Sequence, residues 1–316
     1  MENRIKLGIS TCLLGKKVRY DGGHKLDHFL TDTFGQYVDY VPVCPEVECG
    51  LGTPREAMRL EGDPENPRLV TTHTQIDLTD RVLKWAKKRV RGLEKENLAG
   101  FIFKNRSPSS GMERVKVYNK KGMPLLKGRG IFAKVFMEHF PRTPAEEDGH
   151  LHDPKIRENF IERVFTLKCW RETRKKKKHL AGLIDFHTKN KLLILSHSEK
   201  HYRMMDRMVA EGKSRPIKGL FRNYETFLMD ALKLKTTFRK NVNVLQHMMG
   251  FFKKELTADE KQELLEIIQK YHEGAIPLIV PVTLFNHFVR KYHQPYLEKQ
   301  TYLNPHPIAL KLRNHV

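Results

Sequence analysis

The sequence predicts an α/β domain with a parallel, Rossmann-like sheet, followed by an all-α helical-bundle domain. Short apolar segments alternate with helical patterns over the first 140 residues, and only helical patterns follow residue 152. The length of 316 residues suits two domains of ordinary size. We expect the boundary in the polar, proline-containing segment 141–153, which gives domains 1–143 and 152–316.

The first domain contains three apolar segments that we predict as strands, at residues 4–10, 40–43 and 98–103. Helices are expected over residues 25–34, 78–95 and, after residues 128–130, up to residue 140, and a Pro- and Gly-rich loop is expected from residue 44 to about 72. Strands that alternate with helices indicate a parallel sheet, and such sheets bind ligands outside the carboxyl ends of their strands.

The second domain shows helix-start signals throughout. Asp153 and Pro154 form a typical N-cap and first-turn pair, Ser198 is expected to cap another helix, and Thr257 begins a capping box. Cys169 lies beside Trp170 within one of these helices, and we expect its thiol to be buried as a small hydrophobic group.

The chain is strongly basic, with a formal net charge of +21. Residues 1–150 carry 26 Lys and Arg against 20 Asp and Glu, whereas residues 151–316 carry 32 against 17. The second half is therefore predicted to contact a polyanion, with nucleic acid favoured over a membrane surface, and a solvated basic surface is the alternative. The predicted RNA-binding residues are Arg174, Lys175, Lys176, Lys189, Lys200 and Arg203.

The cellular compartment of the protein is predicted from the number of cysteines and the lengths of the apolar segments. Four cysteines are too few for a disulfide scaffold, and charged residues occupy the N-terminus where a signal peptide needs an apolar run. The most hydrophobic later segment, residues 275–285, is shorter than the roughly 20 residues of a membrane span. We expect a cytoplasmic protein with no membrane segment, whose cysteines are free to bind metal.

Residues that could bind metal or take part in catalysis follow each predicted strand of the first domain. Cys12 follows the first strand, Cys44 and Glu46 follow the second, and a serine-rich loop at 104–111 follows the third. Thiolates on separate loops would suit an iron–sulfur cluster with one iron lacking a protein ligand, and buried hydrophobic thiols are the alternative. The Cys44–Cys49 spacing does not fit structural zinc, and no Cys-x-x-Cys motif supports thiol redox chemistry.

Four motifs in this order, at residues 9–15, 19–22, 44–55 and 104–111, resemble the thiouracil desulfidase family. Residues 185–193 and 196–198 resemble the YbgA-like domain, which accompanies desulfidases proposed to act on 4-thiouridine in tRNA. The resemblance implies a 4Fe-4S cluster held by three cysteines, with an open iron that takes the sulfur of the substrate.

Two of the implied ligands, Cys12 and Cys44, are present, but Ser110 stands where the third cysteine belongs. A hydroxyl is a much poorer ligand for iron than a thiolate. Three explanations are open: Ser110 is an engineered removal of the ligand, Cys49 supplies the third thiolate, or the chain is a natural variant with a weak or absent cluster.

The resemblance also assigns Glu46 as the catalytic carboxylate, with Ser107 beside it. Without the resemblance, Glu46 suits a helix start equally well, and Ser107 suits a turn. Arg19, Arg55 and Ser109 are expected to bind substrate, although the two arginines could instead pair with Asp21 and Glu56. The predicted function is hydrolytic removal of sulfur from free thiouracil or from 4-thiouridine in tRNA. The alternative is a non-catalytic RNA-binding protein with a degenerate cluster site.

Overall fold

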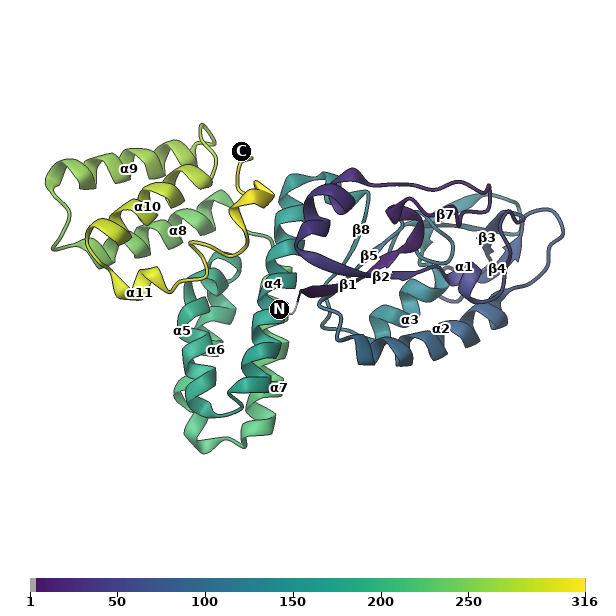
Figure 1. Ribbon diagram of the computed structural model, residues 1–316, viewed down its shortest axis with the longest axis horizontal. Coiled ribbons are helices and arrows are strands. Elements are labelled where there is room, and N and C mark those ends of the chain that lie inside the picture. The colour runs from purple at the N-terminus through teal and green to yellow at the C-terminus, as the bar shows by residue number, and fades with distance from the viewer. Residues whose placement is uncertain (1–3, 316) are drawn as a thin grey trace. The chain divides into compact units, whose positions relative to one another are not determined.

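The computed structural model describes residues 4–315, and the chain divides after Asp153 into two compact units. The first unit contains two β-sheets with flanking helices, and the second is helical (Figure 1). The predicted fold class, an α/β domain followed by an all-α domain, is therefore confirmed. None of the helices formed by residues 4–315 has the length and apolar character needed to cross a membrane.

The main sheet has four parallel strands in the order β2-β1-β5-β8. Their bounds are Ile5–Ser10 for β1, Val38–Val43 for β2, Gly100–Phe103 for β5 and Ala145–Glu147 for β8. Because β2 lies on one side of β1 and β5 on the other, the strand order reverses at β1. Such a reversal leaves a crevice at the carboxyl edge of the sheet.

Two helices, α2 (Thr79–Leu93) and α3 (Ile131–His139), lie side by side along the main sheet (Figure 1). Their apolar residues pack on β5 in a core that four phenylalanines dominate. The ring centroids of these phenylalanines lie 4.3–6.1 Å apart, and the group comprises Phe101, Phe103, Phe132 and Phe136. This aromatic cluster fixes the position of β5 and so of the loop that follows it.

Gly8 of β1 lies directly against the ring of Phe101, and a Cβ atom built there would come within 2.5 Å of Phe101 Cε2. We expect Gly8→Ala to lower the free energy of unfolding by about 1–3 kcal/mol, because the packed rings cannot move aside. Urea denaturation measures this, with Gly92→Ala as control, since Gly92 on α2 faces open space. Equal unfolding midpoints for the two variants would contradict the expectation.

A second sheet has the order β4-β3-β6-β7, with a parallel central pair and antiparallel outer pairs. Its strands are β3 (Met58–Glu61), β4 (Arg68–Thr71), β6 (Val115–Tyr118) and β7 (Pro124–Gly128). The sequence analysis was wrong to expect a single loop up to residue 72. These strands have only four or five residues each, and β7 is exposed except at Gly128, so their hydrophobic pattern is weak.

Two further segments differ from the sequence-based expectation. The predicted helix over residues 25–34 is a single π-helical turn, Phe29–Thr33, followed by a 3-10 turn, Phe34–Gln36. The segment expected as an interdomain linker contains β8 and a 3-10 turn, His150–His152, both of which belong to the first unit. β8 was not predicted because its residues are acidic, although it pairs with β5 in parallel.

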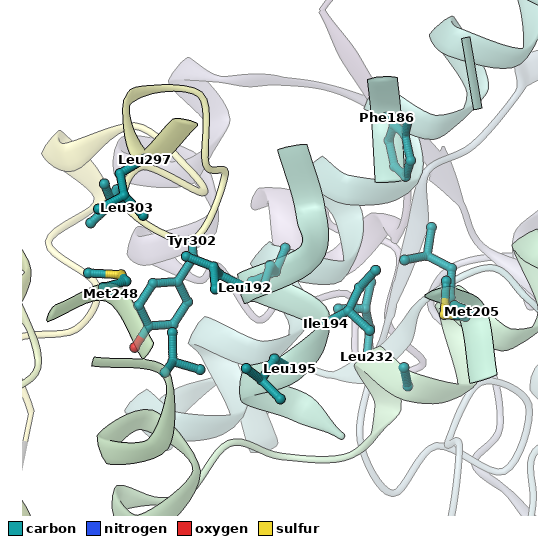
Figure 2. Packing of buried hydrophobic residues seen from close by; sticks show 14 of the residues in the cluster. Phe186, Leu192, Ile194, Leu195, Met205, Leu232, Met248, Leu297, Tyr302 and Leu303 are labelled. Carbon is teal, nitrogen blue, oxygen red and sulfur yellow. The ribbon is translucent and has the colours of Figure 1, made fainter. Parts of the chain in front are cut away.

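The second unit consists of eight α-helices over its described residues, joined by short loops. Their bounds are Pro154–Lys176 (α4), Leu180–His197 (α5), Glu199–Ala210 (α6), Ile217–Lys233 (α7), Phe238–Met249 (α8), Ala258–His272 (α9), Ile279–Lys291 (α10) and Pro295–Glu298 (α11). Figure 2 shows part of the core that they share, including Met205, Leu232 and Tyr302.

The predicted starts of two helices in this unit are confirmed. Ser198 caps α6 by accepting a hydrogen bond from the backbone N–H of His201, and Thr257 forms a complete capping box on α9. Cys169 is exposed on α4, so the expectation of a buried thiol was wrong. Trp170 occupies the core, and with 3.6 residues per turn the preceding residue faces a different direction.

Candidate active site

A cavity of about 400 Å³ lies at the carboxyl edge of the main sheet. The loops that follow β1, β2 and β5 all contribute to it, as expected for strands of one parallel sheet. The polar and sulfur-containing side chains that line it include Cys12, Arg19, Cys44, Glu46, Arg55, Lys104, Ser107 and Ser110.

Both cavity cysteines lie at short helical turns that begin where a strand ends. Cys12 lies in a 3-10 turn, Thr11–Leu14, and Cys44 is the N-cap of a short helix, α1 (Pro45–Glu48). Burial raises the pKa of the Cys12 thiol to about 11 and that of the Cys44 thiol to about 12, and Glu46 adds to both shifts. Both groups are therefore neutral thiols at neutral pH until a metal displaces the proton.

Glu46 on α1 places its carboxylate in the wall of the cavity, where its side chain is only 12% exposed. Oε2 accepts a hydrogen bond from Cys44 Sγ at 3.4 Å, and Oε1 accepts one from Ser109 Oγ at 2.5 Å. The guanidinium of Arg55 lies 3.8 Å from Oε2. The carboxylate thus contacts a thiol, a hydroxyl and a cation, all contributed by different loop positions.

The serine loop reaches Glu46 through Ser109. Ser107 Oγ accepts the backbone N–H groups of Ser109 and Ser110, at 3.3 and 3.1 Å, and lies 3.0 Å from Ser109 Oγ. Ser109 is fully buried between Ser107 and Glu46, and it does not line the cavity. Ser110 lines the cavity, and its hydroxyl has no hydrogen-bond partner within residues 4–315.

Two acidic residues at the end of β8 hold this loop in place. Asp148 accepts hydrogen bonds from the backbone N–H of Asn105 at 2.7 Å and from Lys104 Nζ at 2.8 Å. Glu147 accepts the backbone N–H of Met112 at 2.6 Å. Sequence analysis missed these residues because it assigned them to a linker. The signal was present as an acidic pair directly after a short strand.

Asp148→Ala is expected to lower the free energy of unfolding by about 1–3 kcal/mol, because it leaves the half-buried Lys104 ammonium and a loop N–H without their acceptor. Amide hydrogen exchange should become faster at Asn105 in particular. The control is Glu138→Ala, which removes an exposed carboxylate of α3. Unchanged exchange at Asn105 would show that Asp148 does not anchor the loop.

The two arginines expected at the substrate both line the cavity. Arg19 pairs with Asp21 at 3.4 Å, as one of the predicted alternatives had it. Arg55 lies near Glu46 and not Glu56, whose carboxylate accepts hydrogen bonds from the 73–74 turn instead. Arg55 Nε is buried and has no hydrogen-bond partner among residues 4–315.

Cys49 does not line the cavity. Its thiol donates to the backbone carbonyl of Glu46 at 3.2 Å, and its side chain packs against the apolar cluster beneath the second sheet. Within residues 4–315, no group of three or more His, Cys, Asp and Glu side chains is arranged to hold a metal ion. The side chains that line the cavity include the thiols of Cys12 and Cys44, the carboxylate of Glu46 and the hydroxyl of Ser110.

Cys12, Cys44 and Ser110 come from the three loops that converge on the cavity. A cluster with one open iron needs three protein ligands, and this set matches that number with two thiols and one hydroxyl. Lys104, Arg19 and Arg55 line the same cavity and would offset the negative charge of a thiolate-bound cluster. The third donor is a hydroxyl, so the expected affinity is lower than that of three thiolates.

The basic residues predicted to bind RNA fall into two groups in the second unit. Ion pairs engage Arg174 with Glu225 at 2.8 Å, Lys189 with Asp185 at 2.9 Å and Arg203 with Glu199 at 2.5 Å. The other three are exposed and have no ion pair within the described chain, and they are Lys175, Lys176 and Lys200.

Comparison with known proteins assigns each half of the chain. Residues 7–148 match the 2-thiouracil desulfurase family, and residues 191–307 match a family described as protein of unknown function DUF1722. The uncharacterized protein YbgA of Escherichia coli strain K12 is 28% identical over 134 residues, which are 42% of this chain and 79% of that protein.

A solved structure, the 4Fe-4S-dependent thiouracil desulfidase TudS, shares 27% sequence identity with this chain. The match covers 48% of this chain and 95% of that one, with a TM-score of 0.39. The two family matches do not overlap, and each lies mainly within one of the two units. Residues 7–148 are thus similar to the 2-thiouracil desulfurase family and residues 191–307 to the DUF1722 family, and the chain is similar to YbgA over 134 residues.

Proposed function

We propose that the chain is a hydrolytic desulfidase that replaces the sulfur of a thiolated pyrimidine by oxygen. The observation that carries this proposal is the convergence of Cys12, Cys44, Glu46 and Ser110 on one cavity within the matched region. The water oxygen becomes the new carbonyl oxygen, and both water protons leave with the sulfur as hydrogen sulfide. The reaction is a hydrolysis, so no oxidant or reductant is needed.

The cofactor that we propose is a 4Fe-4S cluster held by Cys12 and Cys44, with Ser110 in the position of the third ligand. When bound, such a cluster supplies a Lewis-acidic iron toward the thione sulfur. Arg19, Arg55 and Lys104 place positive charge around the same cavity, where negative charge develops on the substrate during attack by water.

Glu46 is the proposed general base that takes a proton from the attacking water. Ser109 Oγ donates to Oε1, and Cys44 Sγ makes a longer contact of 3.4 Å with Oε2. That second contact would lose its proton if Cys44 bound metal as a thiolate, and Oε2 would then be the oxygen that accepts the proton of water. Ser107 acts through its neighbours in this arrangement, because its hydroxyl contacts the Ser109 hydroxyl and accepts the backbone N–H of Ser110. Arg55 lies 3.8 Å from Oε2 and places a positive charge beside the proposed base.

The finer proposal concerns the substrate, which we take to be 4-thiouridine within tRNA, with free thiouracil accepted by the same cavity. The net positive charge of residues 151–316 supports an RNA-binding role for the helical domain. Lys175, Lys176 and Lys200 are exposed there without ion pairs in the described chain, so they are available to phosphates. An exposed uridine fits a cavity of this size once it is turned out of its stack.

Anaerobic reconstitution with iron and sulfide, followed by a sulfide-release assay on 4-thiouracil, tests the proposal. We expect absorbance near roughly 400 nm, typical of thiolate-bound clusters, and release of sulfide, both lost in Cys12→Ala. A colourless protein that releases no sulfide, even as the Ser110→Cys variant, would contradict it. If such a protein still bound tRNA in a salt-dependent manner, the non-catalytic RNA-binding alternative would be favoured. The observation that supports this alternative is the serine at position 110, where the third cysteine is expected.

A further inference from the structure

One segment of the second unit carries positive charge and no acidic residue. Residues 231–254 lie between Asp230 and Glu255, contain no Asp or Glu themselves, and have six basic residues, Lys233, Lys235, Arg239, Lys240, Lys253 and Lys254. The segment spans the end of α7, all of α8 and a 3-10 turn, Gly250–Phe252. Such a stretch attracts a polyanion, because no carboxylate within it offsets the cations.

The solvent-facing side of α8 is polar. The opposite side of the helix packs into the core through Asn241, Val244, Leu245 and Met248. We call the solvent side the α8 face and define it by Arg239, Asn243, Gln246 and His247, which follow one another at helical spacing. These four side chains make no hydrogen bond or ion pair within residues 4–315. Guanidinium, amide and imidazole groups of this kind bind phosphates and the edges of unpaired bases in RNA.

An exposed aromatic ring lies at the end of the α8 face. Phe251 belongs to the 3-10 turn that follows α8, and it is 40% exposed. Its ring stacks on that of Tyr296 in α11, with centroids 4.8 Å apart and planes inclined by 16°. Because Tyr296 covers one face of the ring, the other face and the edges are open to solvent. Lys253 and Lys254 follow directly, exposed and without ion pairs in the described chain.

The turn that carries Phe251 is held in place by its neighbours. Phe252 is fully buried, and its ring centroid lies 6.3–6.4 Å from those of Phe285, Phe288 and Tyr292. The backbone carbonyl of Phe251 accepts a hydrogen bond from Gln294 Nε2 at 3.3 Å. The exposed ring is therefore preorganised, so a ligand that stacks on it orders little of the protein.

We propose that the α8 face and Phe251 bind single-stranded RNA, with an unpaired base stacked on the open face of the Phe251 ring. This inference rests on the proposed function and deepens it, because none of the six RNA-binding residues predicted from the sequence lies on this surface. Proteins that bind single strands combine cations along the backbone with aromatic rings that stack bases. An apolar protein partner would use the ring but leave the polar groups of the α8 face without partners.

The test measures affinities of the full-length, metal-free chain by fluorescence anisotropy over a range of salt concentrations. Two labelled strands of equal length are compared, an oligouridylate and a ribose-phosphate strand that lacks its bases. Phe251→Ala removes the ring and Phe251→Tyr keeps one. Leu265→Ala is the matched control, because Leu265 on α9 is 38% exposed.

We expect Phe251→Ala to bind the oligouridylate about tenfold more weakly, as for the loss of one stacked base. Its affinity for the strand without bases should equal that of the wild type, and so should its slope of log K against log salt, because no charge is removed. Phe251→Tyr and Leu265→Ala should bind both strands as the wild type does. Equal affinities of Phe251→Ala and the wild type for the oligouridylate, or equal weakening on both strands, would overturn the proposal.

Arg239→Gln tests the α8 face separately. Removing one phosphate contact to a single strand should make the slope of log K against log salt shallower by about 0.7. Lys270→Gln, which removes an exposed cation of α9, should leave the slope unchanged. A slope for Arg239→Gln equal to that of the Lys270 variant would reject the α8 face as an RNA contact.

Sulfide release from free 4-thiouracil, assayed on the same reconstituted variants, separates failure of this surface from failure of the desulfidase proposal. The binding measurements need neither cluster nor catalysis. If no variant releases sulfide, a contrast between the two strands that depends on Phe251 still supports the surface. If sulfide is released but the wild type binds neither strand in a salt-dependent manner, the surface is rejected and the desulfidase proposal stands.

Discussion

Ser110→Cys is expected to raise the iron and acid-labile sulfide content of anaerobically reconstituted protein toward about four of each per chain, the stoichiometry of a 4Fe-4S cluster. The substitution places a thiol where the structure has an unpartnered hydroxyl facing the catalytic cavity. Because thiolate is a far better iron ligand than a hydroxyl, sulfide release from 4-thiouracil should rise with the cluster, by about tenfold or more. Iron content, absorbance and initial rates measured on the same sample decide the result.

Cys49→Ser in the Ser110→Cys background is the matched control for this experiment. The Cys49 thiol lies outside the cavity and donates to the carbonyl of Glu46, so its removal should leave cluster content unchanged. If Cys49→Ser in the wild-type background removed the cluster, Cys49 would be the third ligand. In that case the loop from residue 44 to 49 would have to rearrange on cluster binding.

Glu46→Gln is expected to lower kcat for sulfide release by about 10²–10⁴, the usual contribution of a positioned general base. Glutamine keeps the shape of the side chain and can still accept the hydrogen bond from Ser109, but it cannot take a proton from water. Cluster content should therefore remain constant while the rate falls. The measurement uses steady-state sulfide release in the Ser110→Cys background, with iron determined on each preparation.

Glu48→Gln provides the comparison for Glu46, because Glu48 lies on the same short helix and does not line the cavity. Its carboxylate accepts the backbone N–H of Cys44 at 2.9 Å and pairs with Arg89, which are structural contacts. We expect a small effect on rate and a modest loss of stability. Similar rates for the Glu46 and Glu48 variants would remove the argument that Glu46 acts as the base.

The parallel sheet could be predicted from sequence because β1, β2 and β5 are apolar and separated by loops or helical patterns. Its fourth strand could not, because β8 is acidic and only three residues long, and its stability comes from pairing with β5. The second sheet was missed for a related reason. An exposed strand such as β7 is held by backbone hydrogen bonds to β6, and those leave little trace in hydrophobicity.

The convergence of Cys12, Cys44 and Glu46 could be predicted because each follows a strand of one parallel sheet. The detailed contacts could not, since they depend on side-chain directions that strand order does not specify. Ser109, rather than Ser107, bonds to Glu46, and Arg55 lies beside Glu46 rather than Glu56. Asp148 and Glu147 act over more than 30 residues of sequence, a separation at which no local pattern indicates a partner.

The loop that carries Ser107 and Ser110 is held by acids that come last in the first unit, at the end of β8. During synthesis, residues 12, 44 and 110 therefore leave the ribosome before the groups that fix their mutual geometry. The contacts that fix the cavity can form only after residue 148 has been synthesised, six residues before α4 begins at Pro154. If the proposed cluster binds in this cavity, its insertion would follow translation of residues 1–148.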